Sequence, residues 1–234
     1  MKNRVRDAFE GKKVALVTGG GRRIGAEICA ALGRVGYVLA PTYLTSRREA
    51  ETLAAGGGGK AYRLDLSRPA TFARFAARLE ADFGRLDLLV HNAAVFPKTP
   101  LETVTSAEWD AVFAVNLRGP SLLTRELLPL MRRAPEGAGV CFIGDAGARE
   151  LWPSYLPYCL SKIALEAYAE GLAGTMPPGI RVGIVRPGLV LPPPGFPAAQ
   201  WERLRRKSRR GIRTLPEIVC TVLRFAASKG SIYQ

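Results

Sequence analysis

The sequence VALVTGGGRRIG at positions 14–25 decides the fold of this 234-residue chain. Its apolar start predicts a buried strand, and its glycine-rich turn opens into a helical pattern over residues 24–34. Glycines permit a tight turn and let backbone N–H groups approach a pyrophosphate at a helix N-terminus. Directly after a first strand, this pattern is typical of a dinucleotide-binding unit, although a glycine-rich loop without a ligand stays an alternative.

Apolar, β-rich runs alternate with helical patterns from this unit to the far end of the chain. The expected strands are Val14–Thr18, Tyr37–Thr42, Ala61–Leu64, Leu86–His91, Val140–Ile143 and Val182–Val185. The expected helices span residues 24–34, 47–55, 70–83, 106–132, 158–173 and 215–228. This alternation predicts an α/β fold with a single Rossmann-type, doubly wound parallel sheet, in one domain over residues 1–234. A proline-rich stretch begins at Pro187, and we expect a substrate loop at about 187–210.

The bulk composition is ordinary for a globular protein with a buried core. Hydrophobic residues make up 47% of the chain, yet no apolar run approaches the roughly 18–20 residues that span a bilayer. The start, MKNRVRDAFEGKK, lacks the apolar stretch of a signal peptide, so we expect a cytoplasmic protein without a membrane partner. The cysteines lie in apolar segments and are expected to be reduced core thiols rather than metal ligands. They are Cys29, Cys141, Cys159 and Cys220.

The formal net charge of +14 is the unusual bulk property. It indicates an anionic partner, such as nucleic acid, an acidic carrier protein or a polyanionic substrate, or else arginines scattered over solvated helix faces. The densest basic cluster, WERLRRKSRR at 201–210, contains no stacking aromatic residue beyond Trp201. A nucleic-acid groove is therefore poorly supported.

An acidic residue is missing from the end of the second expected strand. An NAD site usually places Asp or Glu there to bind the ribose 2′-hydroxyl, but the chain has no acid between Leu39 and Arg48. Hydroxyls and positive charge suited to a 2′-phosphate gather there instead. They come from Arg22, Thr45, Ser46 and Arg47. This composition predicts NADPH as the cofactor, the alternative being that Arg47 and Arg48 only decorate the first turn of a helix.

Tyr158 and Lys162 stand four residues apart within a helical pattern. Such a pair shares one helix face, so the ammonium can lie near the phenol. A free tyrosine has a pKa of about 10 and is a poor acid–base catalyst at neutral pH, but a nearby lysine and a cationic nicotinamide favour the phenolate. The pair alone is common, but beside the glycine-rich turn it predicts the acid–base centre of an oxidoreductase. Tyr155 has Cys159 at the same spacing and lacks this partner.

Five motifs of this chain resemble the short-chain dehydrogenase/reductase family in order and spacing. They are TGGGRRIG at 18–25, HNAA at 91–94, VNLRG around Asn116, Tyr158-x-x-x-Lys162 and RPG at 186–188. The resemblance implies that Asn92 borders the cofactor, that Asp65 faces its adenine, and that Asn116 holds a water in a proton relay through Lys162. Turn or helix capping is the alternative for both asparagines. A homo-oligomer, dimeric or tetrameric, is also implied. The implied cofactor-binding residues are Gly19, Arg22, Arg23, Ile24, Thr45, Ser46, Arg47, Asp65, Leu66, Asn92, Ala93, Lys162, Pro187 and Gly188.

Two departures from the usual family pattern narrow this resemblance. Arg23 stands where the glycine-rich turn normally has a glycine, and Asp145 stands where the catalytic serine is expected, 13 residues before Tyr158. The pteridine reductases, including bacterial dihydromonapterin and dihydrofolate reductases, share both departures. Phe96 also matches the aromatic residue on which that subgroup stacks its pterin. The resemblance therefore implies a substrate site of Arg23, Phe96, Asp145 and Tyr158, with Asp145, Tyr158, Lys162 and Asn116 as the catalytic set.

The chemistry of a carboxyl group agrees with a pterin substrate. A serine hydroxyl suits a carbonyl, to which it can donate, whereas Asp145 can accept from ring N–H groups or pass on a proton. A planar ring also gains from stacking on Phe96. The alternatives are a turn-capping carboxylate for Asp145, a core aromatic for Phe96, and an Arg23 that only binds pyrophosphate.

Three functions therefore remain open from the sequence. The first is an NADPH-dependent pterin or dihydropterin reductase with Tyr158 as the proton donor. The second is a reductase of ketones or 3-oxoacyl-carrier thioesters, against which Asp145 argues. The third is a catalytically silent NADPH-binding protein, against which the intact pair of Tyr158 and Lys162 argues.

A third departure concerns the sheet. Members of the family continue past the last helix into a seventh strand, whereas this chain ends with SIYQ, where that strand would begin. We therefore expect six strands, with the seventh missing and the support of the substrate loop in doubt.

Overall fold

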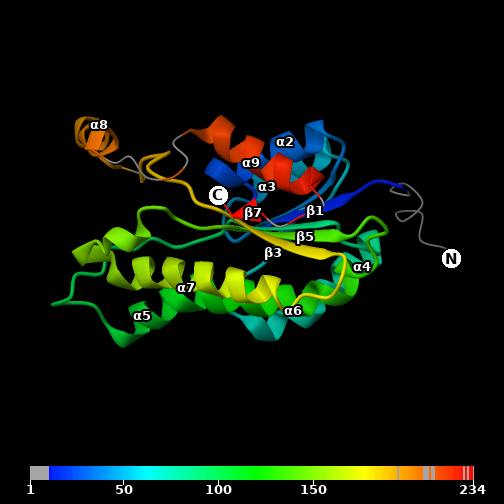
Figure 1. Cartoon of the computed structure of the whole chain (residues 1–234), viewed down its shortest axis with the longest axis horizontal. Coiled ribbons are helices and arrows are strands. Elements are labelled where there is room, and N and C mark those ends of the chain that lie inside the picture. Colours follow the sequence, from blue (N-terminus) through cyan, green and yellow to red (C-terminus); the bar gives the residue numbers. More distant parts are fainter. Residues whose placement is uncertain are drawn as a thin grey trace.

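Seven strands form one parallel sheet in the order β3-β2-β1-β4-β5-β6-β7 (Figure 1). The structure, a computed structural model, describes residues 11–193, 195–207, 211, 214–228, 230 and 232–233. The strands are β1 (Val14–Val17), β2 (Val38–Tyr43), β3 (Tyr62–Arg63), β4 (Leu88–His91), β5 (Ala138–Ile143), β6 (Ile180–Val185) and β7 (Ile232–Tyr233). The predicted single, doubly wound parallel sheet is confirmed.

Helices cover both faces of the sheet, α2, α3 and α9 on one side and α4, α6 and α7 on the other (Figure 1). Alternate residues of β1 enter opposite cores, Val14 and Leu16 into one and Ala15 and Val17 into the other. A strand buried on both faces must be apolar at every position, which is why its sequence reads as a continuous run. The helices are α2 (Arg23–Arg34), α3 (Arg47–Gly56), α4 (Phe72–Phe83), α5 (Ser106–Phe113), α6 (Gly119–Met131), α7 (Leu156–Ala173), α8 (Ala198–Lys207) and α9 (Leu215–Ala227). None of the helices in the described part of the chain is long and apolar enough to cross a membrane.

The seventh strand is present, so the expectation of a six-stranded sheet was wrong. Ile232 and Tyr233 form β7 and pair in parallel with Gly183 and Ile184 of β6. Without this pairing β6 would be the edge strand and would expose a row of backbone N–H and C=O groups. Two residues suffice to continue the hydrogen-bond ladder at that position.

Two other elements differ from expectation. The single helix expected over 106–132 is divided into α5, a π-helical turn at Ala114–Arg118, and α6. The chain stays helical through this π turn, and Pro120, in the first turn of α6, lacks an N–H and cannot continue the regular hydrogen-bond ladder. Residues expected to form only a loop at 187–210 include α8. Cys29, Cys141 and Cys159 are buried as expected, whereas Cys220 is exposed on α9.

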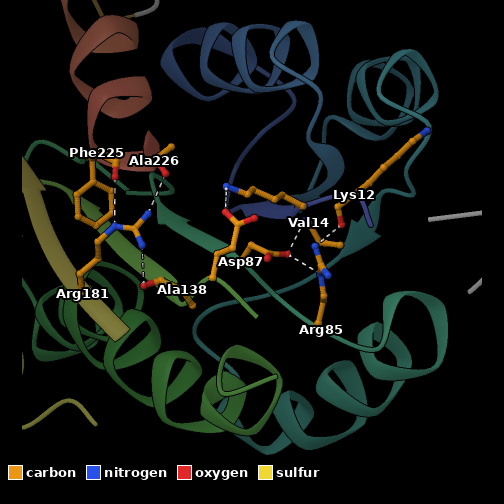
Figure 2. A network of polar contacts seen from close by, with 10 residues as sticks. Lys12, Val14, Arg85, Asp87, Ala138, Arg181, Phe225 and Ala226 are labelled. Atoms are coloured by element: carbon orange, nitrogen blue, oxygen red, sulfur yellow. Dashed lines mark hydrogen bonds and ion pairs between the residues drawn. The ribbon is translucent and has the colours of Figure 1, made fainter. Parts of the chain in front are cut away.

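Arg181 joins three elements at the amino ends of the strands (Figure 2). Its guanidinium donates to the carbonyls of Ala138, Phe225 and Ala226 at 3.2, 3.3 and 2.9 Å. It also lies 5.2 Å from the centre of the Phe225 ring, a cation–π contact. The charged side chain thereby satisfies carbonyls at the C-terminus of α9, which lack partners within the helix.

We expect Arg181→Met to lower the free energy of unfolding by about 2 kcal/mol, because three carbonyls lose a charged donor while the apolar stem is kept. Urea denaturation measures the change. Arg224→Met is the matched control, since Arg224 is an exposed arginine on α9, the helix whose carbonyls Arg181 binds, and its loss should cost under about 0.5 kcal/mol. Equal stability of the two variants would contradict this role of Arg181.

Candidate active site

A cavity of about 650 Å³ opens at the carboxyl ends of the strands, where ligands bind in open α/β sheets. Its walls are segments that follow β1, β2, β4, β5 and β6, together with the first turns of α7. It gathers most of the residues that the sequence singled out. These are Gly19, Arg22, Arg23, Ile24, Thr45, Ser46, Asn92, Ala93, Phe96, Asp145, Tyr158, Lys162, Pro187 and Gly188.

The glycine-rich turn is closed by Asn92, which follows β4. The Asn92 side-chain amide donates to the carbonyls of Thr18 and Gly19 at 3.0 and 3.2 Å. A Cβ on Gly25 would lie 2.3 Å from the Gly19 carbonyl oxygen and 2.5 Å from Asn92 Nδ2. Only glycine fits at position 25, because α2 begins in direct contact with the turn. The N-terminus of α2 therefore faces the cavity, a geometry that suits an anion.

Arg23 spans from this turn to the segment after β6. Its backbone has a φ of +54°, a left-handed value that fits the glycine usual at this position. Its guanidinium donates to the carbonyls of Leu191 and Pro192 at 3.3 and 2.8 Å. The side chain thus ties the two walls of the cavity together. Its expected contacts to pyrophosphate and to substrate stay predictions.

Arg22 is the cation that the structure places at the end of β2. It donates to the Thr45 hydroxyl at 2.5 Å, and Ser46 is buried next to the turn, where a Cβ on Gly21 would lie 2.6 Å from its hydroxyl oxygen. Arg47 instead pairs with Glu51 at 2.8 Å along α3 and does not line the cavity. The positive charge and the hydroxyls there come from Arg22, Thr45 and Ser46.

Asp145 and Tyr158 form the polar centre of the cavity. The Tyr158 hydroxyl donates to Asp145 Oδ2 at 2.6 Å, and the backbone N–H of Gly147 donates to Oδ1 at 2.8 Å. Burial raises the pKa of Asp145, an effect that these two hydrogen bonds and the nearby Lys162 charge oppose. Burial and the Asp145 carboxylate raise the pKa of Tyr158 well above its ordinary value.

Burial and Asp145 thus act against the lowering of the Tyr158 pKa that was expected from Lys162 together with a cationic nicotinamide. Lys162 points to the end of β5 and donates to the Ile143 carbonyl at 2.7 Å. Burial lowers the pKa of Lys162 to about 8, while Asp145 and Glu166 act to raise it. In this structure Tyr158 is a neutral phenol that donates a hydrogen bond to the Asp145 carboxylate.

An aromatic wall adjoins this centre. Phe96 stacks on Tyr155, with ring centres 4.4 Å apart and planes 3° apart, and meets the edges of Tyr158 and Trp152. One face of Phe96 is therefore covered by Tyr155, and the residue is 38% exposed. Trp152 lines the cavity and was missed from the sequence. The run WPSYLPY at 152–158, rich in aromatic residues just before the Tyr–Lys pair, was the available signal.

Four predicted site residues do not line the cavity: Arg47, Asn116, Asp65 and Leu66. Asn116 is buried and binds both backbone groups of Val95 at 2.9 and 3.0 Å and the Ser161 hydroxyl at 3.1 Å. Asp65 accepts from the Ser67 N–H and hydroxyl at 2.9 and 2.6 Å, which forms a local turn. The relay role of Asn116 and the adenine contact of Asp65 stay predictions.

Known proteins resemble this chain over most of its length. A family model described as enoyl-(acyl carrier protein) reductase matches residues 20–218. D-threitol dehydrogenase of Mycolicibacterium smegmatis is 32% identical over 225 residues, 92% of this chain and 86% of that protein. The structure of FolM alternative dihydrofolate reductase 1 from Brucella suis in complex with NADP has 31% identity and a TM-score of 0.81, covering 96% of this chain and 94% of that one. A 3-oxoacyl-[acyl-carrier protein] reductase from Brucella melitensis has 28% identity and a TM-score of 0.80, covering 95% of each chain.

Proposed function

The chain belongs to the short-chain dehydrogenase/reductase family, and on this premise we propose that it reduces a pterin or dihydropterin with NADPH. The hydrogen bond of 2.6 Å between Tyr158 and Asp145 carries the proposal. A carboxyl group occupies the position beside the tyrosine where a carbonyl reductase of this family has a serine. The similar structures of FolM alternative dihydrofolate reductase 1 support it.

The cavity fits a nicotinamide dinucleotide, which supplies the hydride when bound. Arg22, Arg23 and Ile24, at the start of α2, line the cavity, and a helix N-terminus suits a pyrophosphate. Arg22, with the hydroxyls of Thr45 and Ser46, suits a 2′-phosphate. The NADP in the FolM structure from Brucella suis agrees with that choice.

Tyr158 and Asp145 have different roles in the proposed reaction, one as proton donor and the other as hydrogen-bond acceptor. Tyr158 is neutral and holds its proton on a hydroxyl that faces the cavity, so it can deliver that proton to a ring nitrogen. Asp145 accepts hydrogen bonds and matches the N–H groups of an aminopyrimidine ring. The charge of Lys162 acts to lower the pKa of Asp145. Phe96 and Trp152 supply an apolar wall for a flat ring.

A reductase of ketones or 3-oxoacyl-carrier thioesters is the second candidate. The similarity to the Brucella melitensis reductase and the description of the matching family model favour it. Asp145 argues against it, because a carboxylate cannot donate to a substrate carbonyl as a serine hydroxyl does.

The test is NADPH oxidation by the purified protein against dihydropterins, dihydrofolate, quinones and acetoacetyl thioesters. Turnover of a dihydropterin or dihydrofolate above that of the thioester supports the proposal. Activity on the thioester with none on any pterin overturns the pterin assignment. NADPH binding without any turnover supports a catalytically silent protein.

We expect NADPH to bind at least about tenfold more tightly than NADH, which corresponds to about 1.4 kcal/mol. The physical reason is the missing acid after β2 and the cation Arg22 beside Thr45. Fluorescence titration with both cofactors measures the ratio. Arg22→Leu should remove most of the preference, whereas Arg48→Leu, at an exposed position outside the cavity, should keep it. Equal dissociation constants for the two cofactors in the unmodified protein would refute this prediction.

A further inference from the structure

Glu166 is a buried carboxylate on the helix that carries the Tyr–Lys pair. It lies on α7 four residues after Lys162 and eight after Tyr158, so the three side chains share one face of the helix. The residue is only 3% exposed. A Cβ on Gly144 would lie 3.3 Å from Glu166 Oε1, so the carboxylate packs against the backbone directly before Asp145. A buried charge in this position needs partners.

The partners of Glu166 come from both loops that border the centre. Arg186, at the end of β6, places Nε 3.2 Å from Glu166 Oε2. Arg149, in the 3₁₀ turn Ala148–Glu150 after Asp145, places Nη2 3.6 Å from the same oxygen. Arg186 directly precedes Pro187 and Gly188, which line the cavity. One carboxylate therefore connects α7 to the wall after β5 and to the wall after β6.

The two loops are also joined to each other. The backbone N–H of Ala146 donates to the Pro187 carbonyl at 2.9 Å. The loop after β5 and the segment after β6 therefore contact each other, and both contact α7 through Glu166. Loss of the Glu166 carboxylate would remove the ion pair that fixes the Arg186–Gly188 segment to α7, the helix that carries Lys162.

Glu166 also supplies charge to the centre. Lys162 is 4% exposed and has lost most of its hydration, which favours its neutral form. The negative charges that oppose this effect are those of Asp145 and Glu166. The titratable and charged groups around Lys162 and Glu166 are Asp145 and Arg149 after β5, Arg186 directly after β6, and Tyr158, Cys159 and Glu170 on α7.

We propose that Glu166 is a positioning residue of this centre, which holds the Arg186–Gly188 segment in place against α7 and puts a negative charge on the helix face that carries Lys162. The inference rests on the proposed reductase function for its effect on turnover. Its positioning part stands on the ion pairs of Glu166 with Arg149 and Arg186, and the effect of Glu166 on Lys162 is measured without a substrate.

The test compares Glu166→Gln with Glu170→Gln. Glu170 is the matched control because it pairs with the same Arg186, at 3.3 Å, one turn further along α7, but is 58% exposed. Removal of the Glu166 charge should lower the pKa of Lys162 and move the alkaline limb of the kcat profile to lower pH, by about 0.5–1 unit. A merely structural role would reduce kcat equally at pH 6.5 and 9. Glu170→Gln should leave the limb unmoved.

A ¹³C NMR titration of the lysine ε-carbons, assigned with Lys162→Arg, reads the Lys162 pKa without turnover. Arg186→Met is a second, independent variant for the case that Glu166→Gln does not fold. It removes the cation that pairs with Glu166, so the pKa of Lys162 should rise. Opposite shifts in these two variants, with none in Glu170→Gln, support the inference. An unshifted Lys162 in Glu166→Gln overturns it. A wild-type protein inactive on every substrate would overturn the proposed function alone, because the NMR shifts would be unaffected.

Discussion

Tyr158→Phe is expected to lower kcat by on the order of 10²-fold or more, the contribution of one positioned proton donor. The phenol of Tyr158 is the proton-bearing group that faces the cavity beside Asp145, and its raised pKa keeps it protonated across neutral pH. Phenylalanine keeps the ring and its edge contact with Phe96. NADPH affinity should therefore stay nearly unchanged. Steady-state kinetics on the best substrate of the panel, with fluorescence titration of NADPH, measure both quantities.

Tyr155→Phe is the matched control for this prediction. Tyr155 lies three residues earlier and stacks on Phe96, so the control removes a hydroxyl from the same aromatic wall without touching Asp145. Its kcat should stay within about threefold of the unmodified protein. A Tyr158→Phe variant with near-normal turnover would show that another group delivers the proton.

Asp145→Ser is expected to lower kcat/KM for a dihydropterin by about 10²-fold, because charged hydrogen bonds to ring N–H groups are lost. The same change introduces the residue usual in the family, so weak activity on simple ketones should rise. Asp145→Asn separates charge from shape, since it keeps the size of the side chain and one acceptor. Both variants should lose activity on the pterin, and only the serine variant should gain activity on a ketone.

The carrier-thioester function predicts the reverse pattern for Asp145. There Asp145→Ser would be harmless or beneficial on acetoacetyl thioester. Because Asp145 also accepts from the Gly147 N–H, thermal unfolding of each variant must accompany the kinetics. A stable Asp145→Ser protein with unchanged pterin kinetics would show that Asp145 does not bind the substrate.

The layered α/β sheet was predictable from sequence because it depends on patterns that are local. A strand buried on both faces is apolar at every position, and β1 shows this pattern in VALV. The meeting of Gly19, Asn92 and Asp145 at one edge follows from the same prediction, since the carboxyl ends of parallel strands share that edge. The Tyr158–Lys162 pair followed from helical spacing alone.

Only the tertiary structure decided where individual side chains point, because their partners lie far away in the sequence. Arg23 binds carbonyls of residues 191 and 192, and Phe96 is covered by Tyr155. Asn116 binds Val95 instead of lining the cavity. Burial beside Asp145 acts to raise the pKa of Tyr158, an effect that the spacing of Tyr158 and Lys162 could not reveal. Residue types and their periods determine burial and layer order, but the dielectric and the hydrogen-bond partners around a side chain exist only once distant segments have packed together.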